Sequence, residues 1–206
     1  MVLAAEPHEL PLADITADWL EGFEDALRRN DPEGAAKLFL PDGHWRDLLA
    51  FTWHIQTETG AVDIADGLRR TLGATRPRGF HIPTRRTPPR LVTRAGTECI
   101  EAIIAFETAA GPASGVLRLV MDEDARGAWR AWVLLTALDE IRGQEERTGA
   151  RRPDGESFSR EFGAENWLDL RQTAQAYENH EPDVLVVGGG QAGLGIAACL
   201  GQLGLD

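Results

Sequence analysis

Three glycines near the C-terminus have the spacing of a phosphate-binding turn. They are Gly188, Gly190 and Gly193, which form the pattern GxGxxG within LVVGGGQAGLG. In such a turn the first glycine permits a tight strand-to-helix connection, the second lets a pyrophosphate approach the backbone, and the third lets the helix pack closely on the strand. The amides around Gln191 and Ala192 would face the phosphates, and the helix dipole would add attraction. We therefore expect a dinucleotide to bind at these five residues.

The residues on either side of the glycines favour the same interpretation. DVLVV before them is a continuous apolar run, as in a buried parallel strand, and QAGLGIAACLGQL after them predicts a helix with small residues on one face. Gly204 is expected to end that helix. The acidic residue that usually holds the ribose follows the glycines by about 20 positions. It would lie beyond Asp206, so we expect this chain to carry half of a nucleotide site.

A second group of residues has the chemistry of acids and bases. It comprises His44, Asp47, His54, His81, Glu98 and Glu101. A general base needs a polarising donor nearby, and the only tyrosine, Tyr177, lies outside this part of the chain, which excludes a tyrosine oxyanion hole. One interpretation is that Asp47 forms a pair with His44 or with His54. The other is that all six are rim or turn residues, so we assign no catalytic residue and no metal ligand.

Two further groups of side chains leave alternatives open. Four tryptophans either line a ligand pocket or belong to the core: Trp45, Trp53, Trp129 and Trp132. The last two are three apart on one predicted strand, so we expect one inside and the other at an interface. Eight arginines occur without any acid between residues 67 and 97: Arg69, Arg70, Arg76, Arg78, Arg85, Arg86, Arg90 and Arg94. They form either a docking surface or a solvated loop and strand edge.

The elements that position these residues follow from hydrophobic period and capping signals. Helices are predicted over 16–29, after Asp31 with Pro32 in the first turn, and after Asp63. The stretch HWRDLLAFTWHIQTETG suits either extended structure or a short helical turn. Strands are predicted in TECIEAIIAFET, GVLRLVM and WRAWVLLTAL. This order of helices and then strands predicts an α+β fold in which a curved antiparallel sheet wraps around the helices.

Composition and charge exclude several classes of protein. The formal net charge of −12 argues against binding to nucleic acid or to an anionic membrane. No apolar run has the length of a membrane span, and the first residues lack the features of a secretory signal. Cys99 and Cys199 both lie in apolar runs, which predicts buried, reduced thiols in a cytoplasmic protein.

Beyond these patterns, PDVLVVGGGQAGLGIAACLGQLG resembles the FAD-binding start of bacterial, YUCCA-like flavin-containing monooxygenases. GHWRDLLAFTW, LLTALDE and NWLDLR resemble the nuclear-transport-factor-2-like N-terminal extension that some of these enzymes carry. The resemblance implies a flavoprotein oxidoreductase that binds FAD at Gly188, Gly190 and Gly193. NADPH would reduce the flavin at a site outside this chain, and a small organic substrate would be oxygenated.

Together these observations predict four segments. They are a nuclear-transport-factor-2-like α+β cone over 10–141, a linker over 142–165, a connecting helix over 166–181 with Asn166 and Asp169 as a capping box, and the first βα unit of an FAD-binding Rossmann domain over 182–206. The chain is expected to be an inactive N-terminal fragment whose partner is the remainder of the flavin domain. The alternative is a stand-alone cone that binds a small molecule or forms a homodimer.

Overall fold

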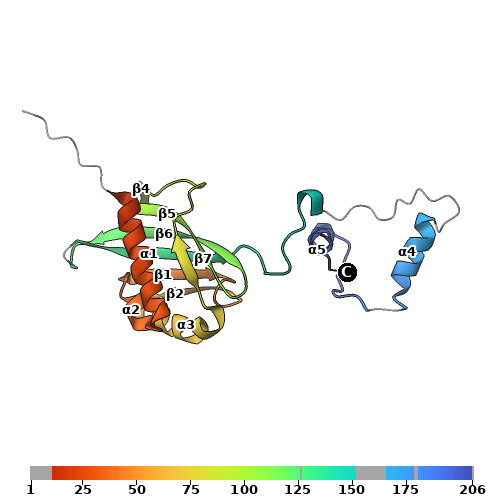
Figure 1. Ribbon diagram of the computed structural model, residues 1–206, viewed down its shortest axis with the longest axis horizontal. Coiled ribbons are helices and arrows are strands. Elements are labelled where there is room, and N and C mark those ends of the chain that lie inside the picture. The colour runs from red at the N-terminus through yellow and green to blue at the C-terminus, as the bar shows by residue number, and fades with distance from the viewer. Residues whose placement is uncertain (1–10, 126, 152–165, 179–180, 206) are drawn as a thin grey trace, which may run out of the picture. The chain divides into compact units, whose positions relative to one another are not determined.

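The computed structural model describes residues 11–125, 127–151, 166–178 and 181–205. The chain divides after Arg142 into two compact units (Figure 1), and each is described by itself. Most of the expected linker, residues 152–165, lies outside the described residues.

In the described residues of the first unit, three helices lie on one face of a curved sheet (Figure 1). They are α1 (Leu12–Arg28), α2 (Pro32–Ala36) and α3 (Gly60–Thr75). Asp31 caps α2 as predicted, because its carboxylate accepts a hydrogen bond from the amide of Gly34 at 2.8 Å. Asp63, predicted as the cap of α3, lies in its first turn instead, and Thr59 holds the N-cap position without a side-chain hydrogen bond.

The sheet contains seven strands: β1 (Phe39–Leu48), β2 (Ile55–Thr59), β3 (Arg78–His81), β4 (Arg90–Arg94), β5 (Thr97–Glu107), β6 (Pro112–Asp122) and β7 (Ala128–Leu138). Their order is β2-β1-β7-β6-β5-β3, and β4 pairs with the other part of β5. All pairs are antiparallel except β1 with β7. The stretch that sequence left ambiguous is therefore extended, and its central residues form the β1–β2 loop.

The core fills the space between the helices and the concave face of the sheet. It is rich in aromatic rings that contact one another: Trp19, Phe23, Phe39, Trp45, Phe51, Phe80 and Phe106. Alternate residues of β5, from Ile100 to Phe106, point into this core and are almost completely buried. The observed architecture is thus the expected α+β cone, a curved sheet around helices.

The described part of the second unit contains a short 3₁₀ turn (Gly149–Arg151) and two helices, α4 (Trp167–Ala176) and α5 (Gln191–Leu203). The predicted capping box of α4 is present: the Asn166 side chain accepts from the amide of Asp169, whose carboxylate accepts from the Asn166 amide. Gly204 ends α5 in the left-handed conformation, with φ of 82°, as predicted.

Candidate functional site

The glycine turn leads directly into α5 and has the tight geometry that its spacing predicts. Gly188 has a φ of 111°, which side-chain-bearing residues rarely adopt. A Cβ atom on Gly193 would lie only 1.9 Å from the carbonyl oxygen of Gly188, so glycine alone fits there. By contrast, a Cβ on Gly188 or Gly190 would meet nothing within 4 Å. The turn is closed on its helix side and open on its outer side.

The amide groups at the start of α5 border this open side. Gly190 is the N-cap, and its carbonyl accepts from Leu194 at 3.0 Å, which is the first hydrogen bond of the helix. The first four N–H groups of a helix have no partner within it, so those of Gln191 and Ala192 can donate to an external acceptor. All five residues predicted to bind phosphate therefore lie in one turn with available donors.

The segment before the turn differs from the prediction. Residues 184–187 form no strand, and Leu185 and Val187 are 82% and 89% exposed. A strand requires a hydrogen-bonded neighbour, and no other strand exists in the described part of this unit. Cys199, predicted to be buried, is exposed on α5 for the same reason: no sheet covers the helix within the described residues of this unit. Cys99 is buried as predicted.

The structure does not bring the six candidate acids and bases together. Asp47 points to the concave face of the sheet, whereas His44 lies on the convex face and contacts the Thr59 hydroxyl through Nδ1 at 2.9 Å. His54 and Glu98 are exposed. His81 is also exposed, and its Nδ1 is 2.8 Å from the carbonyl oxygen of Gly79. A His44–Asp47 pair is excluded by the alternation of side chains along β1.

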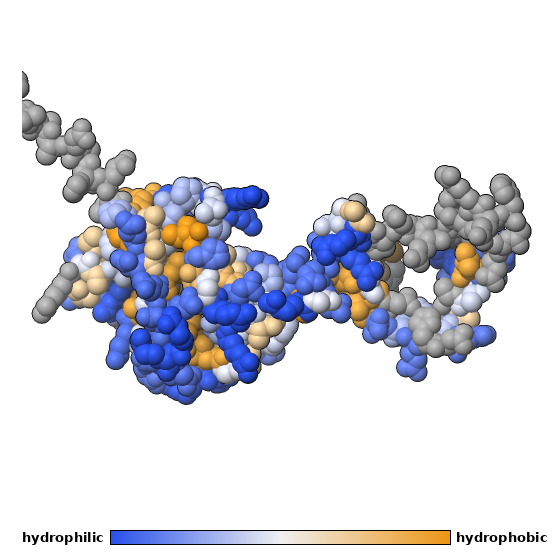
Figure 2. Space-filling view, in the orientation of Figure 1, coloured by the Kyte–Doolittle hydropathy of each residue, from blue (hydrophilic) through white to orange (hydrophobic). Residues whose placement is uncertain are grey.

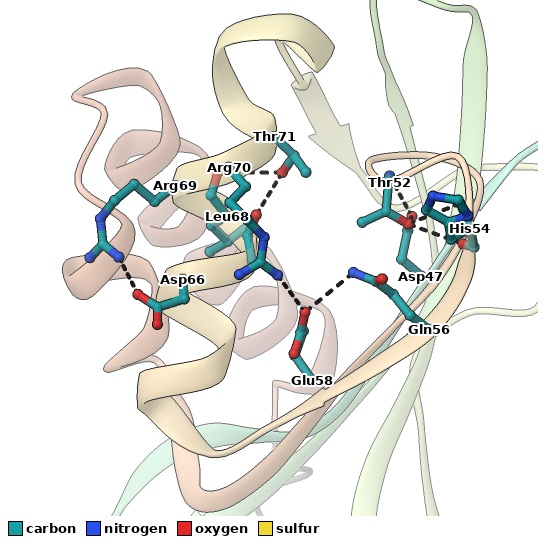
Figure 3. A network of polar contacts seen from close by, with 11 residues as sticks. Asp47, Thr52, His54, Gln56, Glu58, Asp66, Leu68, Arg69, Arg70 and Thr71 are labelled. Carbon is teal, nitrogen blue, oxygen red and sulfur yellow. Dashed lines mark hydrogen bonds and ion pairs between the residues drawn. The ribbon is translucent and has the colours of Figure 1, made fainter.

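Asp47 is buried and holds the β1–β2 loop from inside (Figure 3). Its carboxylate accepts hydrogen bonds from the amides of Phe51 and Thr52, from the Thr52 hydroxyl at 2.7 Å, and from the Thr136 hydroxyl at 2.6 Å. The Trp45 indole N–H donates to that Thr136 hydroxyl at 3.0 Å. With four donors on its two oxygens, Asp47 has the contacts of a structural residue.

An ion pair between Glu58 and Arg70 joins β2 to α3, and a second ion pair lies within α3 (Figure 3). Glu58 accepts from Arg70 at 2.8 Å and from the Gln56 amide at 3.2 Å, and Arg69 pairs with Asp66 on α3. These pairs account for two of the eight arginines in the acid-free segment. Two others, Arg90 and Arg94, bind Glu101.

Glu101 is the centre of a group of arginines that sequence reasoning missed. Three guanidinium groups reach its carboxylate: Arg90 at 3.0 Å, Arg94 at 2.7 Å and Arg118 at 3.0 Å. The hydrogen bonds from Arg94, followed by those from Arg90 and Arg118, lower the pKa of Glu101 to about 2 against the opposing effect of burial. A carboxylate that is so weakly basic is a poor general base at neutral pH.

The four tryptophans divide between core and surface, and a β-bulge in β7 sets the position of one of them. Trp45 is buried and Trp129 packs against the core, whereas Trp53 is 55% exposed. In β7, Val133 pairs with Arg118 and Ala131 pairs with the next residue of β6, so Trp132 is the extra residue of a bulge and is half-buried.

A groove of about 490 Å³ runs between α1 and β3. Apolar side chains line it together with four polar ones: Ala17, Leu20, Phe80, Ile82, Glu21, Glu24, Arg28 and His81. The Glu24 carboxylate fixes β3 by accepting from the amides of Gly79 and Phe80, at 2.9 and 2.8 Å. Figure 2 shows hydrophobic surface beside α1 on this face of the unit.

Comparison with known proteins gives similarity of structure only. No family model and no curated protein matches the sequence. One similar solved structure is an NTF2-like protein with a cystatin-like fold from Novosphingobium aromaticivorans (14% identity, 62% of this chain and 81% of that one, TM-score 0.41). Another is a putative calcium/calmodulin-dependent protein kinase II association domain from Xanthomonas campestris (15% identity, 67% of this chain and 95% of that one, TM-score 0.47). A third is a ketosteroid isomerase-like protein from Erwinia carotovora atroseptica (11% identity, 64% of this chain and 99% of that one, TM-score 0.45).

The described residues include neither a metal-binding cluster nor a membrane-spanning helix. They contain no group of three or more His, Cys, Asp or Glu side chains placed to hold a metal ion. Within the same part of the chain, no helix is long and apolar enough to cross a bilayer.

Proposed function

We propose that residues 184–203 are the pyrophosphate-binding turn for FAD in a flavin-dependent monooxygenase that uses NAD(P)H. The observation that carries this proposal is the contact of Gly193 with the carbonyl of Gly188, which leaves no room for any side chain. The choice of FAD and of a monooxygenase rests on the resemblance of GGGQAG and its surroundings to that family. FAD, when bound, supplies the redox chemistry.

The residues of this chain would hold the cofactor and take no part in electron transfer. The amides of Gln191 and Ala192 are placed to donate to the pyrophosphate, and the positive end of the α5 dipole favours its charge. The space around Gly188 and Gly190 fits the close approach of phosphate oxygens. Exposed apolar residues at 184–187 support a further strand of a flavin domain as the neighbour of this unit.

The test is a titration of the isotope-labelled chain with ADP, which carries the same pyrophosphate as FAD. We expect ADP to shift the amide resonances of Gln191 and Ala192. Gly193→Ala should abolish these shifts, because the new methyl group forces the helix away from the turn. Gly195→Ala is the matched control, since its Cβ meets nothing within 4 Å. Absence of shifts in the unaltered chain, or equal shifts in Gly193→Ala, would overturn the proposal.

A second candidate function, that of a stand-alone cone binding a small molecule, is favoured by the groove between α1 and β3. Its volume of about 490 Å³ lies in the usual range for ligand sites, and it combines apolar walls with His81 and Glu21. A neutral apolar dye should bind in this groove of the unaltered chain. The Ala17→Trp variant should bind the dye more weakly, because the indole ring fills the groove. Ala13→Trp, at another exposed position of α1, should have no effect. Equal loss of dye in both variants would refute this candidate.

A further inference from the structure

The arginines around Glu101 lie on the convex face of the sheet, opposite the core. In one row across three strands, Arg90 of β4 pairs with Glu101 of β5, which pairs with Arg118 of β6. Arg94 lies farther along β4 on the same face, four residues from Arg90. The backbone pairing of the sheet therefore fixes the three guanidinium groups around a single point.

Glu101 uses only part of the hydrogen-bonding capacity of these arginines. Each guanidinium has five N–H donors, but the contacts to Glu101 are one from Arg90, two from Arg94 and two from Arg118. The other N–H groups have no acceptor in the part of the chain that the structure describes. The Arg118, Arg94 and Arg90 side chains are 30%, 40% and 54% exposed, so an external acceptor can reach them.

The three arginines also carry more positive charge than the single carboxylate of Glu101 neutralises. Three positive charges face one carboxylate that is itself only 10% exposed, which leaves a net charge of +2 in a chain with a formal charge of −12. The nearest acid along β5, Glu98, pairs with Thr93 on the other face of the strand. A local excess of positive charge attracts an anion, whereas the negative charge of the whole chain opposes the binding of polyanions.

We propose that Arg90, Arg94 and Arg118 form a binding site for the phosphate group of a small molecule. Guanidinium groups match the geometry of phosphate oxygens with paired hydrogen bonds, and a phosphate dianion balances the residual charge of +2. Glu101 occupies part of the hydrogen-bonding capacity of the three arginines. Val133, which pairs with Arg118 across the sheet, offers an apolar contact beside the site.

The test is a titration of the whole chain with inorganic phosphate, followed by the Nε–H resonances of the arginines at constant ionic strength. We expect saturable shifts of Arg94 and Arg118, and weaker binding of acetate. Arg118→Gln should weaken phosphate binding roughly tenfold, as for the loss of one charge-assisted hydrogen bond. Arg69→Gln removes a salt-bridged arginine on α3 and should leave the affinity unchanged.

A second variant separates binding from mere stabilisation of the sheet. Glu101→Gln removes the carboxylate that competes with phosphate for the guanidinium groups, so it should strengthen phosphate binding while it lowers the stability of the fold. Weaker phosphate binding in folded Glu101→Gln would overturn the proposal. Lack of saturable shifts, equal binding of acetate and phosphate, or an equal effect of Arg69→Gln would overturn it as well.

Discussion

Glu101 shows how a single residue can look catalytic in a sequence and be fully occupied in the fold. Its position in an alternating strand was predictable, and its partners were not. Arg90 and Arg94 belong to a strand that no sequence pattern indicated, and Arg118 lies 17 residues away on the neighbouring strand. The register of three strands decides these contacts, and register depends on the packing of the whole sheet.

The low pKa of Glu101 predicts a pH-dependent contribution to stability. The pKa falls from an ordinary value of 4.5 to about 2 on folding, so the ionised carboxylate stabilises the folded state fully above pH 4.5. That contribution is lost as the pH falls towards about 2. Urea unfolding should therefore show Glu101→Gln to be less stable than the unaltered chain at neutral pH, with the difference shrinking in acid. Glu123→Gln, at an exposed turn position, should show no such difference at either pH.

At the scale of the elements, the β1–β2 loop contains two non-glycine residues with a strained backbone conformation. Leu49 and Trp53 have φ values of 68° and 55°, in the left-handed region that large side chains avoid, and both side chains are exposed. The hydrogen bonds from the loop to buried Asp47 hold this conformation. Sequence reasoning took Asp47 as a candidate base, because its type was visible and its four donors were not.

Removing the backbone strain at Leu49 should make the fold more stable. Leu49→Gly should raise the free energy of unfolding by about 1 kcal/mol, because glycine adopts positive φ without cost and little buried surface is lost. Leu48→Gly, one residue earlier in β1, should lower it, since glycine weakens a strand. Chemical denaturation of the two variants checks this. A loss of stability in Leu49→Gly as large as that in Leu48→Gly would contradict the explanation from strain.

Much of the secondary structure was predictable because it depends on local signals. The cap of α2 by Asp31, the capping box at Asn166 and the alternation in β5 follow from neighbours within a few residues. The short strands β3 and β4 were not predictable, because they are extended only through pairing with β5. The bulge at Trp132 also depends on the partner strand.

At the scale of the whole molecule, the core belongs to the first unit alone. All buried residues of the hydrophobic cluster lie between Trp19 and Leu134, and none of the residues of α4 and α5 whose side chains the structure describes is buried. A chain that ends at Arg142 should therefore keep the thermal unfolding transition of the full chain, within a few degrees. Calorimetry of both chains checks this. A much lower transition temperature in the shorter chain would show that residues beyond Arg142 stabilise the cone.

The two cysteines differ in exposure, so their rates of chemical labelling can report on local opening of the sheet. Cys199 is open to solvent, whereas Cys99 is completely buried on the convex face, where Val92 of β4 pairs with it. Burial also raises the pKa of the Cys99 thiol, which suppresses its reaction with alkylating reagents. A thiol reagent would mark Cys199 at once and Cys99 only during moments when β4 lifts away from β5. The labelling rate of Cys99, compared with that of Cys199, would measure how often β4 separates from β5.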